Sequence, residues 1–83
     1  MKQSINKPVT ITSLGFKQGN TPYPRRMEFD GACYEFIDAG ISLVAKTGEQ
    51  ITRIMTMTDG HKQFRLRSDN RGGIWTLLDI SVA

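Results

Sequence analysis

Three arginines and one tryptophan are the residues whose types and spacing point most clearly to chemistry. Arg53, Arg65 and Arg67 fall in stretches where apolar and polar residues alternate, and Trp75 follows a short polar segment. In the strand register that we expect, the arginines project from one outer face of a hairpin, and Arg71 lies in the next loop. Arginine binds phosphate and an aromatic ring stacks on bases, which is the chemistry of single-strand nucleic-acid recognition.

The same residues have two other interpretations. Arg and Trp are both enriched in protein–protein interfaces, so this face also suits a protein partner or a second copy of the chain. Otherwise Trp75 belongs to the core or lies under the segment that holds Tyr23, and the arginines form a solvated face. The sequence leaves open whether Trp75 is core or surface.

Catalytic and metal-binding chemistry has little support. The single histidine, His61, lies beside a turn with only Asp59 near it. A metal site needs three or four converging ligands, and the chain has one His and one Cys. Cys33 is expected beside Glu28 and Glu35, whose negative charge disfavours a thiolate nucleophile. We therefore predict a protein that is not an enzyme and that holds no metal and no cofactor.

Length and composition limit the class of protein. A chain of 83 residues has room for one domain, and it buries only roughly 60–65% of its unfolded surface, so dimerisation would supplement its stability. The net charge of +3 permits a nucleic-acid partner without requiring one. A single cysteine excludes an intramolecular disulfide. The first residues lack an apolar signal region and no apolar run could span a membrane, so we predict a cytoplasmic protein with no membrane partner.

Short antiparallel strands are the elements that must position these side chains. We predict an all-β fold, a small antiparallel meander of about six or seven short strands that closes into a barrel or a compact sandwich. Residues 1–7 are expected to be a loose segment, and residues 8–83 a single β domain.

The first predicted strand begins at Pro8, and Gly15 near its end marks a bulge or bend. Residues 17–24 form a predicted loop in which two prolines hold Tyr23 in extended geometry. We expect the Tyr23 ring to cover one end of the core, since tyrosine is usually at least partly buried.

The first hairpin is predicted from the turn signal Asp30-Gly31, which lies between two alternating stretches. A two-residue turn sets Phe29 opposite Ala32, and it sets Arg26 opposite Glu35 as a pair of unlike charges. The core face then carries Met27, Phe29, Tyr34 and Phe36, and the outer face carries Arg26, Glu28, Cys33 and Glu35.

Residues 41–46 follow this hairpin and have two interpretations. They could form a strand, or a helical turn capped by Asp38. Because six residues are short for a helix, we favour the strand, followed by a turn over residues 47–50.

The second hairpin, over residues 51–68, depends on the length of its loop. A two-residue loop would set Ile54 against Arg65. A three-residue loop, with Gly60 in the left-handed region, instead pairs Ile54 with Phe64. We predict the three-residue loop, which directs Thr52, Ile54, Phe64 and Leu66 inward and Arg53, Met55, Arg65 and Arg67 outward.

The last strand, over residues 74–82, is apolar on both faces and is expected to be sandwiched or to close a barrel. We predict a non-enzymatic β-barrel binding module for single-stranded nucleic acid. The alternative is a protein-interaction or self-assembly module that uses the same face or an edge strand, such as the last one. A small-molecule site near Tyr23 is a third class that no polar cluster supports. The predicted contact residues are Arg53, Arg65, Arg67, Arg71 and Trp75.

Overall fold

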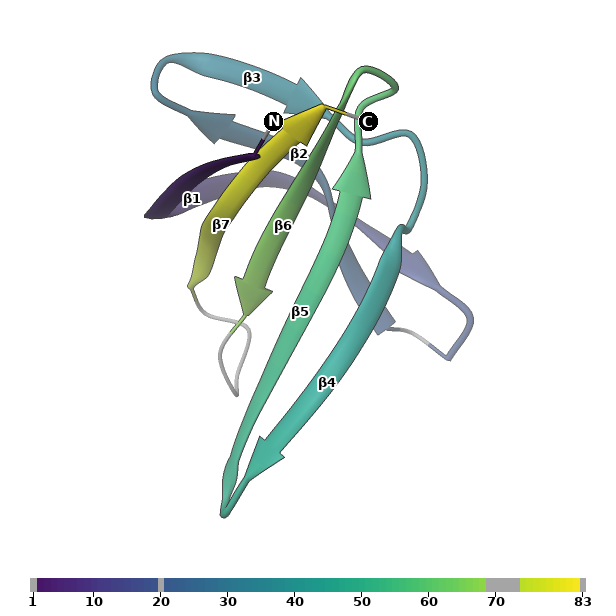
Figure 1. Ribbon diagram of the computed structural model, residues 1–83. Coiled ribbons are helices and arrows are strands. Elements are labelled where there is room, and N and C mark those ends of the chain that lie inside the picture. The colour runs from purple at the N-terminus through teal and green to yellow at the C-terminus, as the bar shows by residue number, and fades with distance from the viewer. Residues whose placement is uncertain (1, 20, 69–73, 83) are drawn as a thin grey trace.

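Alternating side chains along most of the chain produce one continuous antiparallel sheet. The computed structural model describes residues 2–19, 21–68 and 74–82. In this part of the chain the sheet has seven strands in the order β3-β2-β1-β7-β6-β5-β4 (Figure 1). The all-β antiparallel class is therefore confirmed. The strands are β1 (Lys2–Lys17), β2 (Thr21–Phe29), β3 (Ala32–Glu35), β4 (Ile41–Thr47), β5 (Gln50–Thr58), β6 (Lys62–Ser68) and β7 (Trp75–Val82).

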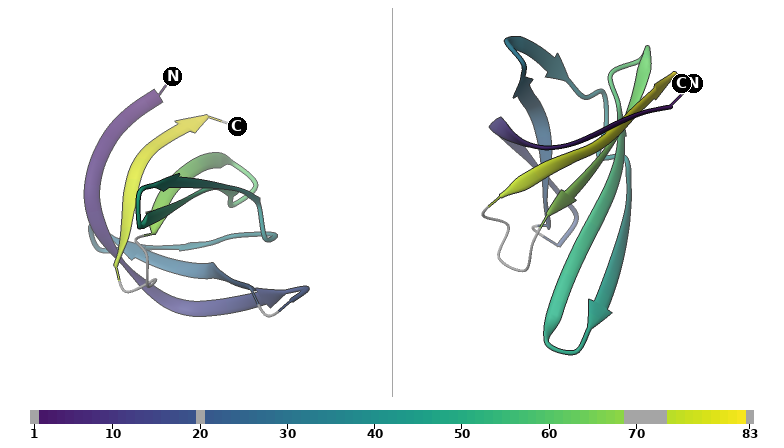
Figure 2. Two further views of the ribbon diagram at one scale, coloured as in Figure 1. Left: turned by 90° about the horizontal axis from the view of Figure 1, so that it is seen from below. Right: turned by 60° about the vertical axis from the view of Figure 1, so that its left-hand side comes forward.

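The sheet curls on itself but does not close. β1 and β7, the first and last strands, pair in the middle of the sheet, and β3 and β4 are its two edges. β1 bends so that its first half pairs with β7 and its second half with β2, which gives two layers with the core between them (Figure 2). The expectation that the last strand could serve as an edge is wrong, because β7 lies between β1 and β6.

The expectation of a loose segment over residues 1–7 is wrong for Lys2 to Lys7, which form the start of β1. This half of β1 pairs with β7, and one extra residue is accommodated between Ser4 and Lys7. Asn6 takes up the irregularity with a φ of 54°, a conformation that asparagine tolerates better than most residues. Ile5 beside it packs against the core.

The first hairpin forms as predicted. Asp30 and Gly31 both have positive φ, 53° and 78°, as a type I′ turn requires. Phe29 pairs with Ala32, and Arg26 pairs with Glu35, with 3.1 Å between Arg26 Nη2 and Glu35 Oε1. Its inner face contributes aromatic residues to the core, since Tyr34 and Phe36 both contact the ring of Phe64. The buried apolar residues are Met27, Phe36, Met55, Met57, Phe64, Leu66, Trp75 and Leu77.

The second hairpin has a different register from the predicted one. Its strands close at Thr58 and Gln63, so the loop is longer than the three residues expected, and Met57 pairs with Phe64 and Met55 with Leu66. The burial of Phe64 and Leu66 and the positive φ of Gly60 are confirmed. The prediction for the inner face of β5 is wrong, because Met55 and Met57 fill the core in place of Thr52 and Ile54.

Tyr23 is partly buried, as predicted, but it lies in strand β2 and not in the loop expected over residues 17–24. It packs against the core, and a Cβ at Gly15 would overlap its ring, so Gly15 provides room for the ring and is not itself the bulge. The register shifts of β1 fall between Ile11 and Leu14. β2 tolerates its prolines at positions 22 and 24 because its pairing with β3 covers only residues 26–29, so no described strand on that side needs an N–H from either position.

Asp59 organises the loop of the second hairpin. Its carboxylate accepts hydrogen bonds from the backbone N–H groups of Lys62 and His61, each at 2.8 Å. Desolvation raises the pKa of Asp59, but these hydrogen bonds and the charge of His61 outweigh it, so the pKa lies below its usual range. A carboxyl whose pKa is lowered by folding stabilises the fold above its unfolded pKa, about 4, and loses this contribution as the pH falls through the folded pKa.

We expect Asp59→Asn, which keeps an acceptor oxygen but cannot ionise, to remove part of the loss of stability that wild type suffers below about pH 4. The measurement is the urea midpoint of both proteins from about pH 6 to about pH 2. Glu28→Gln, on an exposed position of β2, is the control and should change the acid profile less. Identical acid profiles for wild type and Asp59→Asn would contradict this role of Asp59.

Candidate protein-interaction edge

The predicted arginine face is divided between the two sides of the sheet. Arg65 and Arg67 alternate with the buried Phe64 and Leu66, so they project outward, as predicted. Arg53 does not join them. It shares the inner face of β5 with Met55, and its Nη1 donates a hydrogen bond to the carbonyl oxygen of Pro22 at 3.3 Å. The outward placement predicted for Arg53 is therefore wrong, because the register of the hairpin turns β5 over.

Trp75 lies on the inner face with an exposed fraction of 7%. It pairs with Ser68, which pairs in turn with Arg53, and directly opposed residues share one face of a sheet. The structure thus brings Trp75 and Arg53 into one row inside the fold, away from Arg65 and Arg67. Arg71 lies outside the described residues.

Arg65 already forms an ion pair on the outer face. Its Nε lies 3.1 Å from Oδ2 of Asp79, and Lys2 Nζ lies 3.6 Å from the same oxygen. The Asp79 side chain is only 6% exposed, because these two cations cover it. Across the strands, Arg67 is flanked by Thr76 and Ile54. A phosphate group on this face would compete with Asp79 for Arg65 and would find no aromatic neighbour in these rows.

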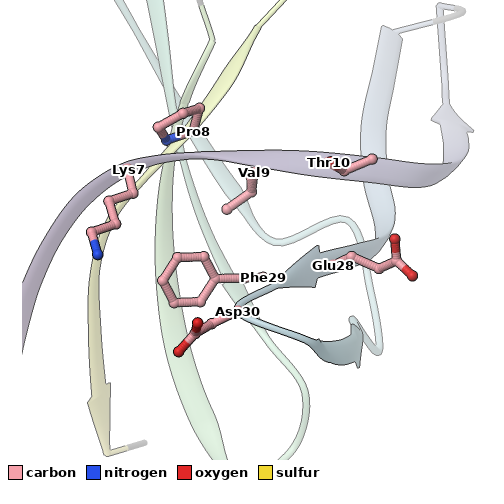
Figure 3. A pocket seen from close by; sticks show the side chains of 7 residues that line it. All are labelled: Lys7, Pro8, Val9, Thr10, Glu28, Phe29 and Asp30. Atoms are coloured by element: carbon pink, nitrogen blue, oxygen red, sulfur yellow. The ribbon is translucent and has the colours of Figure 1, made fainter.

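Two hollows lie in the surface of the described part of the chain. One, of about 370 Å³, lies between β1 and the β2–β3 turn, where Val9 points toward Phe29 while Glu28 points away (Figure 3). The other, of about 440 Å³, is lined by the β3–β4 connection and by parts of β4, β5 and β6. Among the described residues, no group of three or more His, Cys, Asp and Glu side chains is placed to hold a metal ion.

β4 carries the largest group of exposed apolar side chains on a single described strand. Ile41, Leu43 and Val44 are 76%, 65% and 57% exposed. The strand pairs with β5 alone, and the β4–β5 hairpin projects beyond the other strands (Figure 1). Its turn is the predicted one, and Gly48 has a φ of 60°, as the first central residue of a type II′ turn requires.

The hairpin turn determines which backbone groups of β4 are directed away from β5. Thr47 and Gln50 flank the two turn residues and therefore form a hydrogen-bonded pair. The N–H and C=O of Thr47 thus point toward β5. The direction of these groups alternates along an antiparallel strand. The N–H and C=O groups of Ser42, Val44 and Lys46 therefore point outward, along the free edge of the sheet.

The two edges differ in how well they are protected. Proteins prevent edge strands from pairing with other chains by keeping these strands short, by β-bulges, or by lysine and proline residues on them. β3 has four residues, and Cys33 and Glu35 on it are exposed. β4 has seven residues, pairs with β5 without a register shift, contains no proline, and has Lys46 as its only charged residue. β4 is therefore an open edge, and the sequence indicated it only as a strand.

Comparison of the chain with protein-family models, curated proteins and solved structures finds no match. No helix in the described part of the chain is long and apolar enough to cross a membrane. The choice between candidate functions therefore depends on the geometry of the two faces and the two edges.

We expect Trp75→Ala to destabilise the domain by about 3–5 kcal/mol, because it removes a buried aromatic side chain and leaves a cavity. The measurement is the free energy of unfolding in urea. Ile74→Ala is the control, since Ile74 is the neighbouring residue and is 60% exposed. This variant should stay within about 0.5 kcal/mol of wild type. If Trp75→Ala were as stable as Ile74→Ala, the inner position of Trp75 would be contradicted.

Proposed function

We propose that this protein is a non-enzymatic binding module that joins proteins by pairing its edge strand β4 with a strand of the partner. The observation that carries the proposal is the contrast between the two edges. β3 is short and carries exposed polar side chains, whereas β4 combines outward backbone groups with three exposed apolar side chains. In recognition by strand addition, main-chain hydrogen bonds supply affinity and alternate side chains supply specificity.

The free energy available at β4 is adequate for such binding. Fully burying a Val, Leu or Ile side chain contributes about 1.5–3 kcal/mol, and Ile41, Leu43 and Val44 are all more than half exposed. The strand is already paired with β5 along its whole length. A partner therefore meets an ordered edge, which keeps the entropic cost of binding low.

Nucleic-acid binding is the less supported alternative. Arg53 and Trp75 belong to the inner face, and Arg65 bonds to Asp79. The nucleic-acid hypothesis would therefore rest on Arg67 and on Arg71, which lies outside the described residues. A cytoplasmic location is part of our proposal, and the exposed free thiol of Cys33 supports it because a reducing compartment preserves such thiols.

The proposal is tested by a photo-crosslinking amino acid placed at Leu43 on β4, in the native host. We expect covalent protein adducts from position 43 and few from the same group at Arg67, which lies on β6. Val44→Pro should abolish the adducts at position 43. The Val44 N–H points away from β5, so proline there removes an outward donor without breaking the hairpin.

The melting temperature of Val44→Pro is the control for folding and should be close to that of wild type. Absence of adducts at position 43, or adducts that persist in folded Val44→Pro, would contradict edge pairing. Adducts with RNA or DNA at Arg67 that weaken steeply with salt would favour the nucleic-acid alternative.

A further inference from the structure

We infer that the strand which pairs with β4 is β4 of a second copy of this chain, antiparallel and with Val44 opposite Val44. This inference rests on the proposed function, since it names the partner of the same edge. The described outer edge of β4 contains everything that such a symmetric pairing needs: outward backbone groups at regular spacing, and no like charges brought into opposition.

The direction of the backbone groups restricts the register. Only Ser42, Val44 and Lys46 direct N–H and C=O groups outward, so these residues of one copy must be opposite the same set in the other. A two-fold axis then passes between two copies of one residue, and the candidates near the middle of β4 are Leu43, Val44 and Ala45. If the axis fell between two residues, each outward residue of one copy would lie opposite a residue of the other copy whose N–H and C=O groups already bond to β5.

Hydrogen bonding favours the axis at Val44. This register sets Val44 opposite Val44 and Ser42 opposite Lys46, so all three outward residues of each copy are paired. An axis at Ala45 would set Ser42 opposite Gly48, which lies outside β4 in the turn. An axis at Leu43 would instead set Lys46 opposite Gly40. The N–H of Gly40 already donates to Oδ1 of Asp38 at 2.8 Å, so that pair could not form its full set of bonds.

The side chains agree with this register. Lys46, the only charged residue of β4, is set opposite Ser42 and away from the other Lys46, which avoids a destabilising like-charge pair. Leu43, which lies opposite Ile54 of β5, is set opposite Ala45 of the other copy. An apolar strip therefore crosses the interface from one copy to the other.

Symmetry also explains why this edge is left open. An interface that uses the same surface on both copies is complete with two copies and does not propagate. Pairing would cover β4 of both copies and leave the short β3 strands, with the proline-containing start of β2, as the edges of the joined sheet. A single pair of strands is smaller than a standard interface of about 1,600 Å², so we expect a weak dimer whose population depends on concentration.

The register is tested by disulfide trapping of the purified chain in a Cys33→Ser background, because Cys33 is exposed. Directly opposed, hydrogen-bonded residues have Cα atoms about 5.5 Å apart, within the range that a disulfide spans. We expect Val44→Cys to form a covalent dimer on mild oxidation. Leu43→Cys should remain mainly monomeric, since its two copies are diagonal in this register, roughly 7–8 Å apart. Preferential trapping of Leu43→Cys would overturn the register.

The dimer itself is tested by sedimentation equilibrium over a range of concentrations. Val44→Lys opposes two like charges and should weaken association at least tenfold. Ile74→Lys introduces the same charge at a residue that is 60% exposed and immediately precedes β7. It should leave association unchanged.

The outcomes separate this inference from the proposed function. A purified chain that stays monomeric, and a Val44→Cys variant that does not cross-link, would overturn the second copy as partner. If crosslinks from Leu43 in cells then contain a different protein, the proposed function stands without this inference. If crosslinks from Leu43 are also absent, both fail.

Discussion

The pairing of β1 with β7 determines where this sheet ends. Because the first and last strands lie together in the middle, the two edges come from the centre of the chain. The segment between them, residues 36–40, links these edges without a strand pairing between β3 and β4. The Ile37 N–H donates to the Thr58 carbonyl at 3.0 Å, and Gly40 approaches Thr56 so closely that a Cβ would overlap the carbonyl oxygen. The connection thus runs beside the last residues of β5, on the side where β4 then pairs.

The core follows from the same arrangement. Phe64 on β6 lies at its centre, with Tyr34 and Phe36 contacting its ring at centroid distances of 5.0 and 5.4 Å. These rings come from the other layer of the sheet, so the two layers are held together although their edges do not meet. Burial on this inner face accounts for Trp75 and for both methionines of β5. The aromatic chemistry of the chain is largely used for stability, which leaves little of it for recognition on the outer face.

The sequence predicts those parts of the fold in which a local signal sets the register. In the first hairpin, Asp30 and Gly31 accept the positive φ of a type I′ turn, and the whole register follows. In the second hairpin, the side chain of Asp59 bonds to the backbone of His61 and Lys62 and lengthens the loop. A change of one residue in register exchanges the two faces of a strand, and this is why the inner face of β5 was assigned wrongly.

The candidate site was less predictable than the fold, for two reasons. The arginine cluster depended on the wrong register, so Arg53 was assigned to a face that it does not occupy, and the sequence left open the inner position that Trp75 takes. The open edge depends on the long-range pairing of β1 with β7, which no local pattern reveals. Ile41 and Leu43 have the same alternation in the sequence as the residues of a buried strand. Only the strand order shows that no described strand pairs with the outer side of β4.

The central claim is that β4 is an edge strand whose outward amides form hydrogen bonds with a partner strand. Amide hydrogen exchange measured residue by residue tests this claim most directly. At low protein concentration, the account predicts fast exchange at Ser42, Val44 and Lys46 and slower exchange at Leu43 and Ala45, whose amides point toward β5. At high concentration, the three outward amides should become protected. Equal protection of alternate residues along β4 at low concentration would contradict the account, and so would outward amides that exchange at the same rate at every concentration.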